Sequence, residues 1–349
     1  MAEIKMPPER DCGFYQRRKH DKWREIPPPE PSLEGPVADS HAHVHMLPNP
    51  AWELVRCVAN GVRFICEICD PSEDKLDVPS AVRIWADEAS EGVATCGKLP
   101  FESNGQAADP PNVNGASAVR YYGPSSEQGV QLRNMPTVRV SAGVHPHNAK
   151  LYDDEVERRL LEWLSAPETV VVGEIGLDYH YDFSPRDAQR EVFRRQIQLA
   201  KELDMPIALH LRGGNDPETD NAHAEAFRIL SEVGFPSRGT ILHCCALPPD
   251  ELRPWIEAGC YIAYGGTLTF KNAEAAREGA LIVPDERLLL ETDSPYMAPE
   301  PMRGTTCTPA HVIFTAAALA ELRGRVPGPD REQFLAQLYA NTLRFFEVA

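Results

Sequence analysis

The residues of this chain that could carry chemistry are histidines and carboxylates placed at the ends of apolar segments. The first group alternates along residues 37–45 and consists of Asp39, His41, His43 and His45. If this segment is a strand, its alternation places all four side chains on one face. Two imidazoles at positions i and i+2 can share a metal ion, and a carboxylate two residues earlier can orient one of them. A chance cluster of histidines is the alternative interpretation.

The same arrangement recurs later in the chain. Glu174, His210 and His243 each follow an apolar run. Near the C-terminus, three leucines at positions 288–290 precede Glu291 and Asp293. This run is too short for a helix and is stopped by a Ser-Pro pair, so it predicts a buried strand whose end carries carboxylates.

These strand-end residues predict a metal site. Active sites of (β/α)8 barrels lie at the C-terminal ends of the strands, so groups from different strands meet there. We therefore expect one converging set of ligands: His41, His43, Glu174, His210, His243 and Asp293. Four imidazoles and two carboxylates are enough for two metal ions if Glu174 bridges them.

The order of elements indicates an α/β protein with the (β/α)8 TIM barrel fold in residues 37–349. Strand signals lie at residues 37–45, 62–69, 137–144, 170–178, 206–212, 239–243, 260–264 and 288–291. Helical spacing or a helical stop signal is found at residues 51–60, 72–91, 156–164, 186–203, 221–233, 309–323 and 330–347. Eight strands alternating with helices are typical of this barrel.

Two segments fall outside this alternation. Residues 1–36 are rich in proline and predict an extended arm that does not form a domain. Residues 96–136 are rich in Gly, Pro, Asn and Ser and predict a long insertion, either a mobile surface loop or a functional lid. The Cys66-x-x-Cys69 pair has no second pair with matching spacing, and its segment alternates like a strand, so we expect core cysteines rather than a zinc site.

Composition excludes several classes of protein. The formal net charge is −17 and the pI is near 5.1, so the chain has no basic field that would coat nucleic acid or an acidic membrane. No signal peptide or membrane span is evident, and the nine cysteines are expected to be reduced. These features predict a cytoplasmic protein without a membrane partner, and nothing in the sequence indicates an obligate protein partner.

Beyond these patterns, the motifs resemble those of a known family. In chain order they are Asp39-Ser-His-Ala-His43, Gly143-Val-His-Pro-His147, Gly173-Glu-Ile-Gly-Leu-Asp-Tyr179, His210-x-Arg212, His243-Cys244, Gly265-Gly-x-Leu-Thr-Phe270 and Glu291-Thr-Asp-Ser-Pro-Tyr296. From about residue 37 to the end, the chain resembles the TatD family of metal-dependent hydrolases, within the amidohydrolase-like barrels. It departs from the family in the long segment 70–136 and in Thr306-Cys-Thr-Pro309, where the family often has Asn-Glu-Pro.

The resemblance implies a division of the ligands between two metal ions. His41, His43, Glu174 and Asp293 would hold one ion. Glu174, His210 and His243 would hold the other. Four imidazoles suit Zn²⁺ or Mn²⁺, whereas the nucleases of the family are associated with Mg²⁺, so the sequence leaves the metal open.

Further residues near these ligands have expected roles. Two divalent ions beside a phosphate would polarise its oxygens and lower the pKa of a water to roughly 7, and Asp293 would accept the proton. Arg212 would clamp a phosphate oxygen, or else form a salt bridge with a neighbouring acid. His145 and His147 would contact the substrate. The remaining acids, expected to orient metal ligands, are Asp39, Asp178 and Glu291.

The family resemblance implies deoxyribonuclease activity first. A hydrolase of another ester or amide, such as an aminoacyl-tRNA deacylase, is the alternative, and a binding scaffold without catalysis is a third reading. Residues 1–36 carry seven basic and seven acidic side chains, so the charge of −17 belongs to the rest of the chain. We therefore expect the substrate to be a single-stranded or frayed DNA end threaded toward the metals, rather than long duplex DNA.

Overall fold

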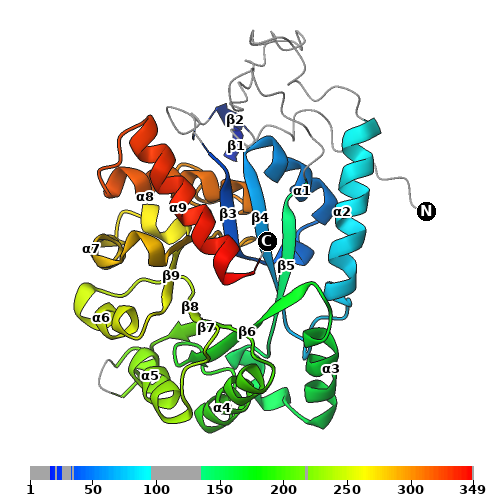
Figure 1. Cartoon of the computed structure of the whole chain (residues 1–349), viewed down its shortest axis with the longest axis vertical. Coiled ribbons are helices and arrows are strands. Elements are labelled where there is room, and N and C mark those ends of the chain that lie inside the picture. The colour runs from blue at the N-terminus through cyan, green and yellow to red at the C-terminus, as the bar shows by residue number, and fades with distance from the viewer. Residues whose placement is uncertain are drawn as a thin grey trace.

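The computed structural model describes residues 16–19, 22–25, 33, 35–95, 135–216 and 219–347. One eight-stranded sheet runs in chain order from β3 to β10, with every neighbouring pair parallel. Helices surround these strands (Figure 1). The strands are β3 (Val37–Ala42), β4 (Val62–Cys69), β5 (Thr137–Ala142), β6 (Thr169–Asp178), β7 (Ile207–Arg212), β8 (Thr240–Leu242), β9 (Tyr261–Tyr264) and β10 (Leu288–Leu290). The predicted (β/α)8 barrel is confirmed.

The barrel is closed where the end of β3 meets the segment that follows β10. Ala42 forms an isolated parallel bridge with Ser294. Asp293 N donates to His41 O and His43 N donates to Ser294 O, each over 2.8 Å. The closure therefore brings the first and last segments that carry predicted metal ligands side by side.

The barrel interior is apolar at one end of the strands and ionisable at the other. Ala208 and His210 share a face of β7, and Ile241 and His243 have the same relation at the end of β8. Ala208 and Ile241 belong to a buried cluster that also contains Phe345 and Phe346. The C-terminal residues of the last helix thus close the end of the barrel opposite the histidines.

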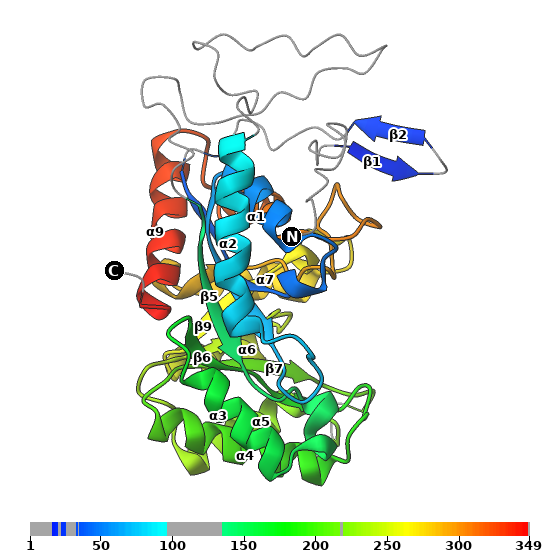
Figure 2. The same ribbon diagram turned by 90° about the vertical axis from the view of Figure 1, so that its right-hand side faces the viewer.

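The helices pack outside the barrel through a second, larger apolar layer. Figure 2 shows α3, α4 and α5 together on one side of the molecule. The helices are α1 (Pro50–Ala59), α2 (Val78–Thr95), α3 (Asp154–Leu164), α4 (Arg186–Glu202), α5 (Ala222–Val233), α6 (Pro249–Glu257), α7 (Glu274–Ile282), α8 (Val312–Leu322) and α9 (Pro329–Phe345).

Two of these helices, α6 and α7, were not located from the sequence. Proline inside a helix removes a hydrogen bond, so Pro254 hides the helical signal of α6. In α7, Gly279 weakens the signal in the same way. A Cβ at Gly279 would lie 2.4 Å from Leu247 O, so the close approach of α7 to this loop requires glycine.

The N-terminal extension and the insertion are only partly described. In the extension, β1 (Gln16–Lys19) pairs antiparallel with β2 (Lys22–Glu25). The rest of the predicted arm, apart from residues 33, 35 and 36, lies outside the described residues, as does the insertion apart from residues 135 and 136. Among the described helices, none combines the length and the apolar character that a membrane span requires. Cys66 and Cys69 are free and buried in the core, as expected.

Candidate metal centre

All six residues expected to bind metal lie at the same end of the barrel. His41 and His210 belong to strands β3 and β7, and Glu174 to β6. The other three, His43, His243 and Asp293, directly follow the ends of β3, β8 and β10. Ligand atoms within 4.8 Å of one another form three groups that use only these residues: His41, His43 and Glu174; His41, His243 and Asp293; and Glu174, His210 and His243.

Two carboxylates face the histidines of β3. Glu174 Oε2 lies 3.4 Å from His41 Nε2. Asp293 Oδ1 lies 3.5 Å from His43 Nε2 and 3.8 Å from His41 Nε2. Asp293 has φ +58°, a left-handed conformation in which aspartate is more common than most residues. Together with the hydrogen bond from Asp293 N to His41 O, this turn fixes the carboxylate against both histidines.

The other oxygen of Glu174 faces the histidines of β7 and β8. Glu174 Oε1 lies 2.6 Å from His210 Nδ1 and 3.6 Å from His243 Nε2. The two oxygens of this one carboxylate therefore contact two different groups of imidazoles. This is the arrangement that a bridging carboxylate between two cations requires.

The donor atoms fit a metal ion. His41 Nε2 is buried and makes no hydrogen bond to any described residue, although buried ring nitrogens normally have a partner. Burial, reinforced by His243, lowers the pKa of His41, so this imidazole is neutral. Burial opposes ionisation of Glu174 and Asp293, but the surrounding histidines hold the pKa of each carboxyl below its usual range. Neutral imidazoles and ionised carboxylates are the forms that bind metal.

The cluster as a whole attracts positive charge. Burial opposes protonation of His243, yet Glu291 and Glu174 raise its pKa to about 10. Glu174 and Asp178 likewise raise the pKa of His210 to about 9 against the effect of burial. Excess negative charge at the site is therefore balanced by protons, and divalent cations can replace them.

Two of the expected orienting acids contact ligand imidazoles directly. Glu291 Oε2 lies 2.9 Å from His243 Nδ1, which directs His243 Nε2 toward Glu174. Asp178 Oδ2 lies 3.2 Å from His210 Nε2, on the ring edge opposite Glu174. Carboxylates in these positions fix the tautomer and orientation of a ligand histidine.

The third expected orienting acid, Asp39, contacts the backbone rather than an imidazole. Asp39 Oδ1 accepts hydrogen bonds from His41 N over 3.2 Å and from Thr292 N over 2.9 Å, and Asp39 Oδ2 accepts one from the Thr292 hydroxyl over 2.5 Å. Asp39 is fully buried. It joins β3 to the segment between Glu291 and Asp293 and so positions ligands through the main chain.

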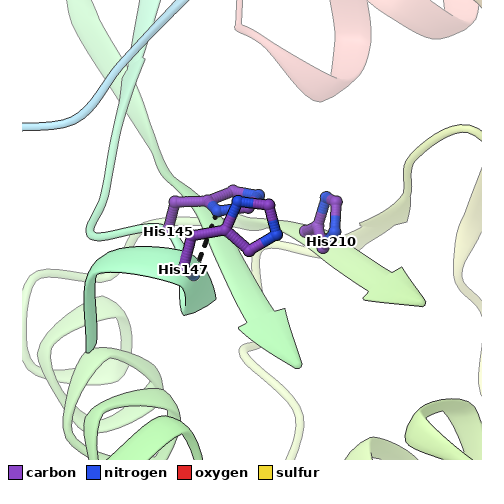
Figure 3. A group of neighbouring side chains, drawn as sticks. All are labelled: His145, His147 and His210. Carbon is purple, nitrogen blue, oxygen red and sulfur yellow. Dashed lines mark hydrogen bonds between the residues drawn. The ribbon is translucent and has the colours of Figure 1, made fainter. Parts of the chain in front are cut away.

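His145 and His147 follow β5 and face His210 (Figure 3). The His145 ring centroid lies 4.3 Å from those of His147 and His210, and His147 N donates to His145 Nδ1 over 3.2 Å. His147 Nε2 lies 2.9 Å from Asp178 Oδ2, the oxygen that also faces His210. The two histidines therefore extend the cluster toward β5. With His210 they form a further group of ligand atoms within 4.8 Å of one another, and His145 Nε2 lies 3.9 Å from Glu174 Oε1.

Arg212 lies at the exposed end of β7, two residues after His210. Its guanidinium carbon is 4.8 Å from the ring centroid of Tyr181. Within the described part of the chain, Arg212 forms no ion pair, so the salt bridge considered as an alternative is not found there. The cation is held by an aromatic face and keeps its donors available.

His45 does not share the face of His41 and His43, contrary to the strand alternation expected for residues 37–45. The strand ends at Ala42, and a short 3-10 helix at Val44–Met46 turns His45 away. His45 Nδ1 lies 2.5 Å from Glu67 Oε1, and its Nε2 lies 3.1 Å from Asp74 Oδ1.

Two acids at the end of β4 support the site and were missed in the sequence. Glu67 accepts hydrogen bonds from the backbone of Val44 and His45, which fixes the loop after His43. Asp70 accepts a hydrogen bond from His145 N over 3.0 Å. Burial raises the pKa of Asp70 to about 6. An acid inside or directly after an apolar strand was the available signal.

A barrel whose mouth gathers four imidazoles and two carboxylates has the donor set of a metal-dependent hydrolase. Residues 38–347 match the family described as TatD related DNase. The chain belongs to this family, as the motifs indicated.

Curated relatives agree with this assignment. The chain is 40% identical over 187 residues to the uncharacterized metal-dependent hydrolase YabD of Bacillus subtilis, covering 53% of this chain and 70% of that protein. It is 41% identical over 186 residues to the uncharacterized metal-dependent hydrolase YcfH of Escherichia coli, covering 53% and 66%. A protein of Citrobacter koseri named 3'-5' ssDNA/RNA exonuclease TatD is 31% identical over 214 residues, covering 60% and 78%.

Solved structures share the fold. The TatD homologue YJJV of Escherichia coli superposes with a TM-score of 0.66 at 22% identity, covering 90% of this chain and 98% of that one. An uncharacterized amidohydrolase of Saccharomyces cerevisiae gives a TM-score of 0.56 at 14% identity, covering 89% and 99%. At these identities the likeness concerns the barrel alone.

Proposed function

We propose that this protein is a nuclease that hydrolyses phosphodiester bonds at single-stranded or frayed DNA ends with the help of two divalent metal ions. One observation carries the proposal: the two oxygens of Glu174 face two separate groups of imidazoles. Paired metal sites bridged in this way are typical of nucleases and phosphatases. The relative named as a single-strand DNA and RNA exonuclease supports the same reaction class.

The proposed ligand sets are His41, His43, Glu174 and Asp293 for one ion, and Glu174, His210 and His243 for the other. Bound divalent cations polarise a phosphate oxygen and lower the pKa of a water. The imidazole-rich donor set suits Zn²⁺ or Mn²⁺, and Mg²⁺ remains a candidate because carboxylates are also present.

The protein's own groups then have distinct tasks. The ionised Asp293 carboxylate contacts both His41 and His43, so it lies where it can accept the proton of an attacking water. Arg212, without an ion pair among the described residues, offers its guanidinium to a phosphate oxygen. His145 and His147 lie beside His210, and we propose that they contact the nucleotide.

A strand end is the expected substrate because of the charge distribution. The net charge of −17 opposes long duplex DNA lying across the surface. A strand that is threaded toward the cations presents one phosphate at a time and needs few lysines or arginines elsewhere. We therefore propose trimming from an end rather than internal cutting.

Time courses on an end-labelled linear oligonucleotide and on a closed circular single strand test this proposal, with Mg²⁺, Mn²⁺ and Zn²⁺ added separately. We expect stepwise shortening of the linear strand and no cutting of the circle. Equal cutting of the circle refutes action from ends. Labels on either terminus give the polarity.

Two further assays address the alternative substrates. RNA of the same sequence tests whether the sugar matters, and mischarged aminoacyl-tRNA tests hydrolysis of an aminoacyl ester. Activity on the ester without activity on either nucleic acid strand overturns the nuclease assignment and favours the deacylase.

We also propose that the protein works in the cytoplasm, because Cys66 and Cys69, like the other cysteines that the structure describes, are free thiols.

A further inference from the structure

Three exposed aromatic rings lie beside the candidate metal centre. Among the described residues, the exposed large hydrophobic side chains include three aromatics: Tyr181, Phe183 and Tyr296, which are 47%, 55% and 50% exposed. Tyr181 and Phe183 pack against His147, and the ring centroid of Tyr296 lies 6.2 Å from that of His43. Exposed rings confined to one site indicate a binding surface, since scattered exposed apolar residues are ordinary but clustered ones are not.

Tyr181 and Phe183 form a stack. Their ring centroids are 5.1 Å apart and the ring planes differ by 14°. The His147 ring meets both at a steep angle, with centroids 5.5 Å from Tyr181 and 4.8 Å from Phe183. The guanidinium of Arg212 lies over the Tyr181 ring. Because Phe183 is still more than half exposed, it can accept another flat ring.

The loop that carries this stack is held in place. Asp178 Oδ1 accepts hydrogen bonds from His180 N and Tyr181 N, both over 2.9 Å. The Ser184 hydroxyl donates to His147 O over 2.7 Å, and Lys150 Nζ donates to Phe183 O over 2.7 Å. The rings are therefore part of a built surface next to β6.

One carboxylate, that of Asp178, contacts both the loop that carries the stack and a proposed metal ligand, His210. Asp178 fixes the backbone of Tyr181 with Oδ1, and its Oδ2 contacts His147 and His210. The ring centroid of His147 lies 6.0 Å from that of His210 and 4.8 Å from that of Phe183, so a nucleoside whose phosphate is bound at His210 would lie near Phe183.

We propose that Tyr181 and Phe183 form a stacking platform for an unpaired nucleobase next to the bond that is cut. This inference rests on the proposed nuclease function and adds which part of the substrate the protein binds, namely the unpaired base. An unpaired base has a free π-face, whereas a base inside a duplex is already stacked on both sides. A protein with a net charge of −17 has few cations for the phosphates, so stacking supplies affinity that electrostatics does not.

The test compares Phe183→Leu with the unchanged protein on two substrates: an end-labelled oligothymidylate and the same strand with abasic residues at its end. We expect KM for the normal strand to rise about tenfold in Phe183→Leu with little change in kcat, as loss of one base–aromatic stack predicts. On the abasic strand both proteins should have equal KM. Phe183→Trp should restore the KM of the normal strand.

Leu281→Ala provides a matched control, because Leu281 is 51% exposed and lies in α7, away from the histidines. It should leave both substrates unaffected. The platform is overturned if Phe183→Leu and the unchanged protein have the same KM on the normal strand. It is also overturned if Phe183→Leu raises KM equally on both strands.

A binding experiment separates this inference from the proposed function. The anisotropy of a labelled phosphorothioate strand, which resists hydrolysis, reports affinity without turnover. If no nucleic acid is cut but binding still weakens in Phe183→Leu for the normal strand alone, the platform stands and the nuclease assignment falls. If nucleic acid is cut but neither KM nor binding depends on the Phe183 ring, the nuclease assignment stands and the platform falls.

Discussion

His243 and Glu291 form a buried pair in which the carboxylate fixes the imidazole: Glu291 Oε2 lies 2.9 Å from His243 Nδ1. Glu291 Oε1 also accepts a hydrogen bond from Cys244 N over 2.7 Å. Because Nδ1 is occupied, His243 can offer only Nε2 to a metal ion, on the side of Glu174. In this pair, an acid that contacts the ring nitrogen facing away from Glu174 fixes the orientation of a predicted ligand.

Glu291→Gln tests that relationship. The amide can still accept a hydrogen bond, but it does not stabilise positive charge on the imidazole or fix its tautomer as firmly. We expect metal affinity or activity to fall by about 10–100-fold, the usual effect of changing such a partner. Titration of the metal-free protein measures it. Glu286→Gln changes an exposed acid outside the site and should leave the affinity unchanged; an equal loss in both variants would contradict the assigned role.

Removal of a ligand should release one metal ion. For His243→Ala we expect elemental analysis to show about one equivalent less metal and turnover to fall by at least ~100-fold, since a cation contributes several kcal/mol of charge stabilisation. Glu286→Gln, which changes an exposed acid outside the ligand groups, serves as the control. Full metal content in His243→Ala would remove this residue from the ligand set.

Asp293→Asn separates metal binding from proton transfer. The amide keeps the shape of the side chain and one oxygen, but it cannot take up a proton from water. We expect KM to change little and kcat to fall at least ~100-fold, the low end of the contribution of a general base. Turnover close to normal, measured with the metal content verified, would assign the proton acceptor to another residue.

Arg212 should act through its guanidinium geometry and not through charge alone. Arg212→Lys keeps the positive charge but loses both the fork that binds phosphate and the planar contact with Tyr181. We expect KM for a single-stranded substrate to rise several-fold in Arg212→Lys and further in Arg212→Ala, at unchanged metal content. Steady-state kinetics on the same oligonucleotide would show it, and a fully active lysine variant would reduce the role to charge.

His311 should make the folded barrel sensitive to acid. Burial, with a smaller effect of Arg56, lowers the pKa of His311 to about 3. Since the unfolded chain protonates this histidine near pH 6.5, stability from the neutral form is complete above pH 6.5 and is lost as the pH falls toward 3.

Between pH 7 and pH 5 this linkage amounts to about 2 kcal/mol. From pH 7 to pH 5, the free energy of unfolding should decrease in both proteins. We expect the decrease to be smaller in His311→Gln than in the unchanged protein, by about 2 kcal/mol. Urea unfolding in the presence of a chelator measures both without a metal contribution. Identical pH slopes would show that His311 is not buried in its neutral form.

The sequence by itself predicted the barrel, which is confirmed, and the strand-end residues that the structure brings together at its mouth. Short apolar runs mark the strands of a parallel barrel, and ionisable residues near their C-terminal ends must lie at the open end, so Glu174, His210, His243 and Asp293 could be predicted without knowing which strands are neighbours. These signals are local. They can be recognised in the sequence because a buried strand tolerates few polar residues before its end.

Only the tertiary structure decided how those residues meet. The two oxygens of Glu174 face His41 and His210 because closure of the barrel brings β3, β6 and β7 to one mouth. Likewise His147 and His210 share one oxygen of Asp178, although they are 63 residues apart in the chain (210 − 147).

The same limit explains the residues that the pattern missed or misplaced. Glu67 supports the turn after His43, and Tyr181 lies beside His147, through contacts between segments that are distant in sequence. His45 leaves the face of its strand because β3 ends at Ala42, where the chain turns toward Glu67. Spacing along a chain specifies which side chains share an element, but strand register and closure of the barrel set the distances between elements.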